Sequence, residues 1–547
     1  MKKSIILTIT AALMLTGCKD SFLERYPEGG TLRQDQYEKL SDQLEGSVRG
    51  LYVKLYSMGG SNHDEFGKRS IDLWGDILCS DIALTGKTYG WLYTDEQMLT
   101  VNRTGTIWGF YYGMMHNINA TIRAFKNGTE FTQHINTYGF PSDITDDKYK
   151  YTEAEYEQAV YYAQVLALRG YAYANLARWY TPVEGSTYMK GYTIEDYSCC
   201  PIYDEYNMDA AQPLSTSDAV YKQAFRDLNL AIRLYEEFGD TYIRPNKLVI
   251  DLEVARGILA EAYLNAAVYY PEEKKVEYLK EARKQATAVI ESGKYRMISN
   301  ANLLKTGFNN VSDESWMWGQ TVTVETSGGL KSWFGQVDIH SYSYAWAGDT
   351  KVIDKNLYDL IPDWDKRKDW FNDGSANSSY ILCPDGKFFS AANPTSTKDD
   401  DLDRDWLSDN VFMRIESMYL IAAEAEYRLA ALGAGDYSKA VTYLKTITDE
   451  RKYEDDAEAD AAYAADVASW SDPSALEKAI IYNWRIEMWG EGYGLETFRR
   501  WNDVRTRGGN HDYNKGGKAD ATEDSYNMNI PSSESTYNPN LKNSDKK

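Results

Sequence analysis

The sequence feature that most constrains the fold is a pair of helical patterns between Arg414 and Ile447. In the first, apolar residues recur at three- and four-residue steps and share one helix face: Met418, Ile421, Ala422, Ala425, Leu429 and Leu432. Gly433 and Gly435 should end this helix, because glycine adopts the left-handed conformation of a C-terminal cap. Asp436 should then cap a second helix, with an apolar face of Tyr437, Ala440, Val441, Leu444 and Ile447. Two such short helices cannot bury their own apolar faces, so neighbouring helices must cover them.

Further helical patterns supply those neighbours. A hairpin of roughly 34 residues is typical of a tetratricopeptide repeat, and two more irregular repeats precede this one. Each has an Arg-Gly pair at a similar depth in its helix, followed by an Ala-rich stripe: Arg169-Gly170 and Arg256-Gly257. The expected helices are Gln34–Tyr56, Thr106–Phe125, Glu153–Tyr180, Ser217–Phe238, Asn246–Tyr270, Glu272–Ser292 and Asp472–Trp489. We therefore predict a mainly α fold, with a tetratricopeptide-like scaffold in one body over residues 32–547.

Two stretches interrupt the helical periodicity. Gly59–Leu99 is expected to be rich in loops. Val311–Asp349 alternates, is punctuated by glycine and contains four tryptophans, which predicts short strands and loops inserted into the helical body. Because binding residues are often carried on loops held by a rigid scaffold, we expect the ligand site around residues 311–349.

The N-terminus has the pattern of a lipoprotein signal peptide over residues 1–17. Lys2 and Lys3 precede an apolar run that is too short to span a membrane stably. The run ends in Leu15-Thr16-Gly17-Cys18, which resembles a bacterial lipobox, so Cys18 is the expected acylated residue. Residues 18–31 would form the lipidated N-terminus and a tether, and the lipid would hold the protein at a membrane.

Charge and motif content exclude several classes of function. The net charge of −23 disfavours binding to nucleic acid, whose phosphates such a surface repels. No zinc-type cysteine spacing or nucleotide-binding loop is present, and we expect no cofactor and no metal. Asp401, Asp403 and Asp405 have the opening spacing of a calcium loop, but Trp406 stands where that loop needs glycine.

Several stretches together resemble the SusD/RagB family of nutrient-binding lipoproteins. Arg414–Glu426, RIESMYLIAAEAE, is similar to the family's R-x-x-E-M-Y-L-I-x-A-E-A motif. Trp484–Gly492, followed by Phe498-Arg499-Arg500-Trp501, resembles the family's E-R-x-x-E-L-x-x-E-G and L-x-R-W run. Ile530-Pro531, Glu534 and Asn538-Pro539 resemble the family's C-terminal ending. One departure is that Gly494 and Thr497 replace an Arg and an Asp of the family, which we interpret as the loss of a structural ion pair.

The resemblance implies a function as well as a SusD-like fold. Members of this family lie on the outer surface of the outer membrane, over a SusC-like TonB-dependent β-barrel transporter. They capture oligosaccharides, polysaccharides or in some cases peptides and deliver them for import. The resemblance therefore implies carbohydrate binding, glycan uptake and a location outside the cell, held by lipid.

An enzyme is the alternative function, and a protein- or peptide-binding repeat scaffold is a third. The sequence shows no G-x-S-x-G or H-E-x-x-H motif, and its five histidines are scattered. A lipid-anchored, all-helical glycoside hydrolase would need two carboxylates. The sequence has 82 acidic residues, and four glutamates lie in the family motifs: Glu416, Glu424, Glu487 and Glu491. We expect these four to be structural, and we predict no catalytic residue.

Aromatic residues in the two irregular stretches are the candidate ligand contacts, because sugars stack their C–H faces on aromatic rings. Trp91 and Tyr93 are two residues apart and would share one side of an extended loop. Tyr342, Tyr344 and Trp346 form an alternating stripe, which either packs within a sheet or contacts ligand, and Trp333 is a further candidate. Trp316 and Trp318 share a strand face with Val322 and Val324, which favours a core role.

Overall fold

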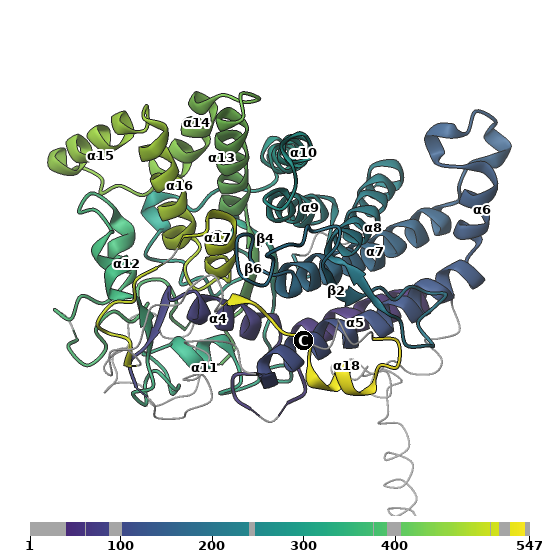
Figure 1. The fold of residues 1–547 in the computed structure, drawn as a ribbon, viewed down its shortest axis with the longest axis horizontal. Coiled ribbons are helices and arrows are strands. Elements are labelled where there is room, and N and C mark those ends of the chain that lie inside the picture. The colour runs from purple at the N-terminus through teal and green to yellow at the C-terminus, as the bar shows by residue number, and fades with distance from the viewer. Residues whose placement is uncertain are drawn as a thin grey trace, which may run out of the picture.

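Helices packed side by side make up most of the molecule in the computed structural model (Figure 1). The structure describes residues 40–60, 62–86, 101–239, 247–375, 377–390, 406–503, 505–512 and 526–541. The signal peptide, Cys18, Trp91, Tyr93 and the Asp401–Asp405 stretch lie outside these ranges. Among the described residues, none of the helices is both long and apolar enough to cross a membrane.

The helices follow one another along the chain, with connections that range from a single residue between α5 and α6 to the long segment between α12 and α13. The N-terminal half contains α3 (Leu40–Tyr52), α4 (Lys68–Leu78), α5 (Val101–Gly128), α6 (Glu130–Tyr138), α7 (Glu153–Tyr180), α8 (Ser217–Phe238), α9 (Leu252–Ala267) and α10 (Glu272–Glu291). The C-terminal half contains α11 (Trp333–Val337), α12 (Lys355–Asp359), α13 (Ile415–Ala431), α14 (Tyr437–Thr448), α15 (Ala457–Ser469), α16 (Pro473–Glu487), α17 (Gly494–Trp501) and α18 (Ser532–Tyr537). Packing runs from α5 through α7, α8, α9, α10 and α13 to α14. The predicted mainly α fold is thereby confirmed.

Glycines set the closeness of two of these helix contacts. A Cβ added at Gly170 in α7 would lie 2.6 Å from Cγ of Leu228 in α8. A Cβ at Gly257 in α9 would lie 2.6 Å from Sδ of Met413. The two Arg-Gly pairs therefore mark places where a helix backbone closely approaches a neighbouring side chain, Leu228 of α8 in one case and Met413 of β6 (Asn410–Arg414) in the other.

The hairpin that the sequence marks most strongly forms as α13 and α14. Gly433 adopts φ +70° after α13, and the Asp436 carboxylate accepts a hydrogen bond from the Ser438 N–H at the start of α14. Both predicted caps are confirmed. Gly435 has a different role from the one expected, because its φ is not positive. A Cβ there would lie 2.7 Å from the backbone nitrogen of Ala430, so this glycine allows a tight turn.

The expectation of loops throughout Gly59–Leu99 is wrong for its middle part. Residues Lys68–Leu78 form α4, and every residue of this helix is buried. Asp72 and Asp76 lie one turn apart on it and break the apolar pattern that would have predicted a helix. Their burial is possible because Lys68 Nζ is 2.9 Å from Asp72 Oδ2, and Asp76 accepts hydrogen bonds from the N–H groups of Gly492 and Gly494.

Six short strands form three antiparallel pairs within the described ranges. They are β1 (Ile82–Leu84) with β5 (Lys351–Ile353), β2 (Ser198–Pro201) with β3 (Leu214–Thr216), and β4 (Trp316–Gln320) with β6 (Asn410–Arg414). The β4–β6 pair joins the insertion, residues 311–349, to the start of α13. It is irregular between Trp316 and Gly319, so both Trp316 and Trp318 are buried.

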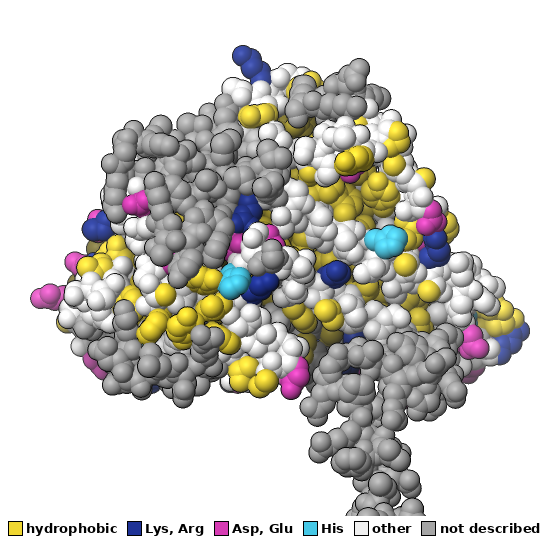
Figure 2. Space-filling model, turned by 90° about the horizontal axis from the view of Figure 1, so that it is seen from below, with side chains coloured by type: hydrophobic (Ala, Val, Ile, Leu, Met, Phe, Trp, Pro, Cys, Tyr) yellow, Lys and Arg dark blue, Asp and Glu magenta, His cyan; other side chains and the backbone are white. Residues whose placement is uncertain are grey.

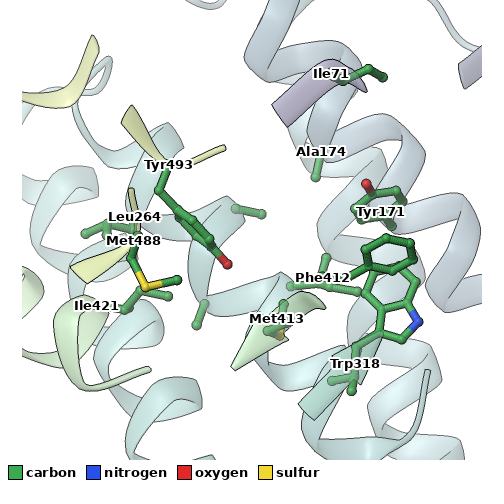
Figure 3. Close-up of a cluster of buried hydrophobic side chains, with 14 of the residues drawn as sticks. Ile71, Tyr171, Ala174, Leu264, Trp318, Phe412, Met413, Ile421, Met488 and Tyr493 are labelled. Carbon is green, nitrogen blue, oxygen red and sulfur yellow. The ribbon is translucent and has the colours of Figure 1, made fainter. Parts of the chain in front are cut away.

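The core confirms that these two tryptophans are packing residues. The Trp318 ring lies edge-on to Tyr171 of α7 and to Phe412 of β6, at centroid distances of 5.4 and 5.3 Å (Figure 3). Met413 lies beside them, so the insertion is attached to the helical layer through β4 and β6. The cysteines of the described ranges are buried and free: Cys79, Cys199, Cys200 and Cys383.

Candidate functional site

The second half of the insertion differs from the alternating strands that the sequence predicts. After β4 the chain forms turns, then the short helix α11, then further turns through residues 338–348. Asp338 organises these turns: its Oδ1 accepts from the His340 N–H at 2.9 Å and its Oδ2 accepts from the Ser341 hydroxyl at 2.5 Å. Because polar side chains fix the backbone in turns here, the alternation of aromatic and small residues does not correspond to a strand. The aromatic residues therefore do not share one strand face.

The turns bring Tyr342 and Trp346 together with a residue distant in sequence. The rings of Tyr342 and Trp346 lie 5.3 Å apart at 47°, and both side chains are half-buried. The Trp406 indole N–H donates to the Tyr342 carbonyl at 3.2 Å, and Trp406 is also half-buried. We call Tyr342, Trp346 and Trp406 the aromatic cluster. It combines partly exposed rings with a fixed backbone, which is the arrangement that stacking on a sugar ring requires.

The backbone around Trp346 is held on both sides. Its N–H donates to the Ser343 hydroxyl at 3.0 Å, and its carbonyl accepts from the Tyr380 hydroxyl at 2.9 Å. Gly329 adopts φ +58°, and a Cβ there would lie 3.2 Å from the Trp406 ring. The ring positions in the cluster are therefore set by neighbouring segments of the chain.

Tyr344 and Trp333 occupy positions different from those of the cluster. Tyr344 is buried, and its hydroxyl lies 2.5 Å from His63 Nδ1. Trp333 has 1% of its surface exposed and packs between Phe388 and the Arg69 guanidinium, which is 4.0 Å from its ring centroid. Neither ring offers a free face, so we treat both as packing residues and not as parts of the proposed site.

The segment that precedes α4 lies against the insertion, as a site shared by the two would require. Lys331 Nζ donates to the Gly60 carbonyl at 2.7 Å, and the Gln336 side-chain amide donates to the His63 carbonyl at 3.0 Å. Figure 2 shows the lower face of the molecule, where hydrophobic side chains gather in patches beside histidine and basic side chains. Gly60 and His63 thus contact the insertion, while Trp91 and Tyr93 remain candidates outside the described residues.

Trp406 was not a candidate ligand contact from the sequence. It follows an acidic stretch, and only tertiary contact places it beside Tyr342. A search for tryptophans flanking irregular segments would have found it. Among the described residues there is no cluster of His, Cys, Asp or Glu that could hold a metal ion.

One carboxyl group near this part of the chain is unusually basic. Burial raises the pKa of Asp385 to about 6, and the positive charge of His340 opposes that rise. The nearby Asp338 carboxylate adds to it. Asp385 therefore changes its charge state under mildly acidic conditions.

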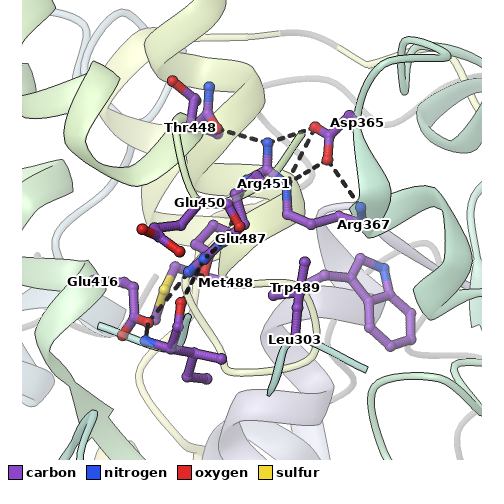
Figure 4. Close-up of polar contacts among 12 residues, drawn as sticks. Leu303, Asp365, Arg367, Glu416, Thr448, Glu450, Arg451, Glu487, Met488 and Trp489 are labelled. Carbon is purple, nitrogen blue, oxygen red and sulfur yellow. Dashed lines mark hydrogen bonds and ion pairs between the residues drawn. The ribbon is translucent and has the colours of Figure 1, made fainter. Parts of the chain in front are cut away.

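The carboxylates of the family motifs are buried in a dense set of ion pairs (Figure 4). Arg414 reaches Glu491 at 2.8 Å, Glu487 at 2.9 Å and Glu416 at 3.0 Å. We call the whole set the buried ionic network: Asp365, Arg367, Lys387, Arg414, Glu416, Arg451, Glu487 and Glu491. Glu424 is likewise buried and paired with Arg500 at 2.8 Å. The prediction that these glutamates are structural is confirmed.

Charge pairing decides the protonation of the central carboxylate. Burial alone would raise the pKa of Glu487, but the charges of Arg451 and Arg414 hold the pKa well below its usual range. Glu487 therefore remains ionised, and it has no exposed surface for a substrate. This network connects α13, α16 and the loops below them, so its role is to hold the scaffold together.

Comparisons with known proteins match the fold and the motifs. Residues 331–542 match the model of the SusD family. A SusD-like protein of Bacteroides ovatus is 24% identical over 443 residues, which cover 78% of this chain and 72% of that protein. A SusD-like carbohydrate-binding protein of Bacteroides vulgatus has a similar structure, with a TM-score of 0.66, 21% identity, and coverage of 92% of this chain and 97% of that one. The surface glycan-binding protein A of Bacteroides thetaiotaomicron has a TM-score of 0.59 and 14% identity, with coverage of 91% and 97%.

Proposed function

We propose, because the chain belongs to the SusD/RagB family, that it is a surface lipoprotein that binds a glycan and does not cleave it. The ligand would be an oligosaccharide or polysaccharide taken up as a nutrient. The protein would then deliver it to a SusC-like TonB-dependent transporter in the outer membrane. Relatives whose descriptions include carbohydrate or glycan binding support this choice over the enzyme and the peptide-binding scaffold.

The observation that carries the proposal is the aromatic cluster. The side chains of Tyr342, Trp346 and Trp406 are half-buried, and the insertion that carries the first two contacts Gly60 and His63. The acidic residues of the motif helices, in contrast, are buried and paired, so they offer no exposed pair of carboxylates for hydrolysis. Partly exposed aromatic rings, together with motif carboxylates that are buried and paired, suit capture and release of a ligand.

Binding is tested by migration of the purified protein through gels that contain single polysaccharides, with reducing ends measured in parallel. We expect retardation in at least one gel without new reducing ends. Trp346→Ala, Trp406→Ala and Trp91→Ala should each reduce the retardation. The matched control is Tyr537→Ala, which removes an aromatic ring that is 83% exposed on α18. New reducing ends would instead support the glycoside hydrolase, and equal migration of all variants would contradict this site.

Anchoring is tested separately from binding. Cys18 would carry the lipid, and Cys18→Ala should move the protein from the membrane fraction to the soluble fraction. Protease added to intact cells should degrade the parent protein if it faces the cell exterior. Retention of Cys18→Ala in membranes after carbonate washing, in cells without the transporter, would contradict the lipid anchor.

The transporter partnership has its own readout. A tagged form of the protein should co-purify from detergent-solubilised membranes with a large β-barrel protein. Cells that lack either partner should fail to import the glycan that retards the protein in gels. Normal import without this protein would contradict the delivery role while leaving binding intact.

A further inference from the structure

A cavity of about 640 Å³ is lined by residues on and beside α12, α15 and α16. These three helices lie at one edge of the helical layer (Figure 1). Aromatic side chains of Trp364, Trp470 and Tyr482 line it, together with aliphatic residues such as Leu360 and Ile481. This volume is within the range of small-molecule sites, which are mostly apolar with a few placed polar groups. None of these residues belongs to the aromatic cluster.

Most polar side chains of the cavity wall already have partners. The Tyr482 hydroxyl donates to Asp365 at 2.7 Å. The Asn483 amide oxygen accepts from Arg367 at 2.9 Å, and its nitrogen donates to the Ala479 carbonyl at 2.8 Å. These groups cannot turn toward a ligand without breaking buried hydrogen bonds.

The same is true of two charged residues in the wall. Arg485 lies 2.7 Å from Asp81, an ion pair that is nearly buried. Asp503 is paired with Arg505 at 3.1 Å. A sugar needs many hydrogen-bonding groups for its hydroxyls, so a wall whose polar groups are already engaged disfavours a saccharide.

Of the two carboxylates in this wall, Asp503 has an ion-pair partner and Asp466 has none among the described residues. The Asp466 side chain is half-buried, and none of the ion pairs found within the described ranges includes it. Burial raises the pKa of Asp466, and the Trp470 and Trp364 side chains partly offset that rise. A half-buried carboxylate without a cation is unfavourable, and a cation placed beside it would remove the penalty.

We propose that this cavity binds a small organic cation, with its ammonium group beside Asp466 and its apolar body against Trp364 and Trp470. Aromatic faces attract such cations through the ring quadrupole, and quaternary ammonium groups are recognised in this way. An organic cation would pair with the Asp466 carboxylate and cover the apolar wall at once. Lys478 is exposed and also lines the cavity. Its positive charge repels a bound cation and so lowers the affinity.

The first experiment compares choline with its neutral isostere, 3,3-dimethylbutan-1-ol, by titration calorimetry on the full mature chain. We expect choline to bind at least tenfold more tightly than the alcohol. Phenyltrimethylammonium should bind more tightly still, because its ring adds contact with the apolar wall, and should change the tryptophan fluorescence. Equal affinity for choline and the alcohol, or no binding of either cation, would overturn the proposal.

Variants assign the binding to this cavity. Asp466→Asn should weaken phenyltrimethylammonium binding at least tenfold, and Lys478→Gln should strengthen it a few fold. Asp460→Asn is the matched control, because Asp460 lies on the same helix but pairs with Lys452 at the surface and should leave binding unchanged. Unchanged binding by Asp466→Asn would overturn the proposal.

A second variant keeps the test valid if Asp466→Asn does not fold. Ala479→Phe places a ring in the cavity from α16 and needs no change of charge. It should abolish binding of phenyltrimethylammonium while leaving the melting temperature near that of the parent. Retained binding in a folded Ala479→Phe protein would place the cation elsewhere and contradict the proposal. The proposal does not depend on glycan binding, which is measured independently in polysaccharide gels.

Discussion

In the buried ionic network, arginines and glutamates pair out of contact with solvent, whereas in the insertion the polar groups fix turns whose aromatic rings stay half exposed. Arg414 contacts three carboxylates and has no exposed surface. Asp338 accepts hydrogen bonds from His340 and Ser341 and so fixes the turns that carry Tyr342 and Trp346. One region uses charge for stability, and the other uses polar groups to present apolar surface.

This difference shows where function can change without loss of the fold. A network in which each charge has several partners tolerates few substitutions, because removal of one member leaves others unpaired. The insertion depends on local turns, so its exposed rings can be replaced with little effect on the helices. Stability and ligand choice are therefore separable in this molecule, and the following changes test that separation.

The largest expected effect is on Arg414. Arg414→Met removes the cation shared by Glu416, Glu487 and Glu491 and should lower the free energy of unfolding by about 3–5 kcal/mol. Denaturant unfolding followed by circular dichroism measures this change. The control is Arg296→Met, since the Arg296–Glu314 pair is mostly exposed and should contribute at most about 1 kcal/mol. Equal effects of the two substitutions would show that the network does not stabilise the fold.

The second prediction compares two tryptophans of the insertion. Trp333→Ala should lower stability by about 3–5 kcal/mol, because it empties a buried site. Trp346→Ala should lower stability far less but weaken glycan binding by about 1–3 kcal/mol, by analogy with stacking on nucleic-acid bases. Thermal melting and affinity gels on the same proteins separate the two effects. Early melting of Trp346→Ala would identify it as a core residue instead.

The helical layer could be predicted because its sequence shows the apolar periodicity and the capping residues that helices require. The observed bounds of α7 equal the predicted Glu153–Tyr180, since a threonine cap begins this helix and Thr181-Pro182 ends it. The start of α14 at Tyr437 follows from Asp436 in the same way. Periodicity and caps are local, so a single sequence reveals them.

The site could be predicted only as a region. The position of α4 was hidden because it carries two buried aspartates: Asp72 pairs with Lys68 on the same helix, and Asp76 finds its partners elsewhere in the chain, at Gly492 and Gly494. The aromatic cluster was hidden because Trp406 meets Tyr342 across more than sixty residues. Alternation in Tyr342–Trp346 predicted the wrong element, since turns held by Asp338 replace a strand. It also could not distinguish the buried Tyr344 from the half-buried Tyr342 and Trp346.

The third prediction uses the dependence of stability on pH. The pKa of Asp385 is about 6 in the folded protein and 3.8 ordinarily, so between these values the folded state binds more protons than the unfolded state. This group therefore makes stability fall as pH rises from about 4 to 6. Asp385→Asn should remove that slope and raise stability at pH 7 by about 1–3 kcal/mol.

The paired carboxylates of the network should give the opposite slope. Glu487 has a lowered pKa, so its contribution is present above the ordinary value of 4.5 and is lost as pH falls below it. Unfolding of the parent and of Asp385→Asn at pH values from 3 to 8 measures both trends. Parallel curves for the two proteins would mean that Asp385 is not protonated in the folded state.

The smallest expected effect comes from two threonines that make the same hydrogen bond in the two kinds of structure. The Thr152 hydroxyl accepts from the Glu155 N–H at 3.3 Å, and the Thr323 hydroxyl accepts from the Thr326 N–H at 3.3 Å. Thr152 caps α7, where the first N–H groups have no partner within the helix, and the Glu155 carboxylate in turn accepts a hydrogen bond from the Thr152 N–H. Thr152→Ala should therefore lower stability by about 1 kcal/mol.

Thr323 lies in an exposed turn of the insertion, where water can replace the lost hydroxyl. Thr323→Ala should change stability by less than about 0.5 kcal/mol, as expected for surface positions. Denaturant midpoints of the two single variants give the two stability changes. In the double variant these changes should add, because the two sites share no partners. If Thr323→Ala costs as much as Thr152→Ala, the turns of the insertion are as important to the fold as the helix caps. Loops and scaffold would then not be separable in the way that the ionic network and the aromatic cluster indicate.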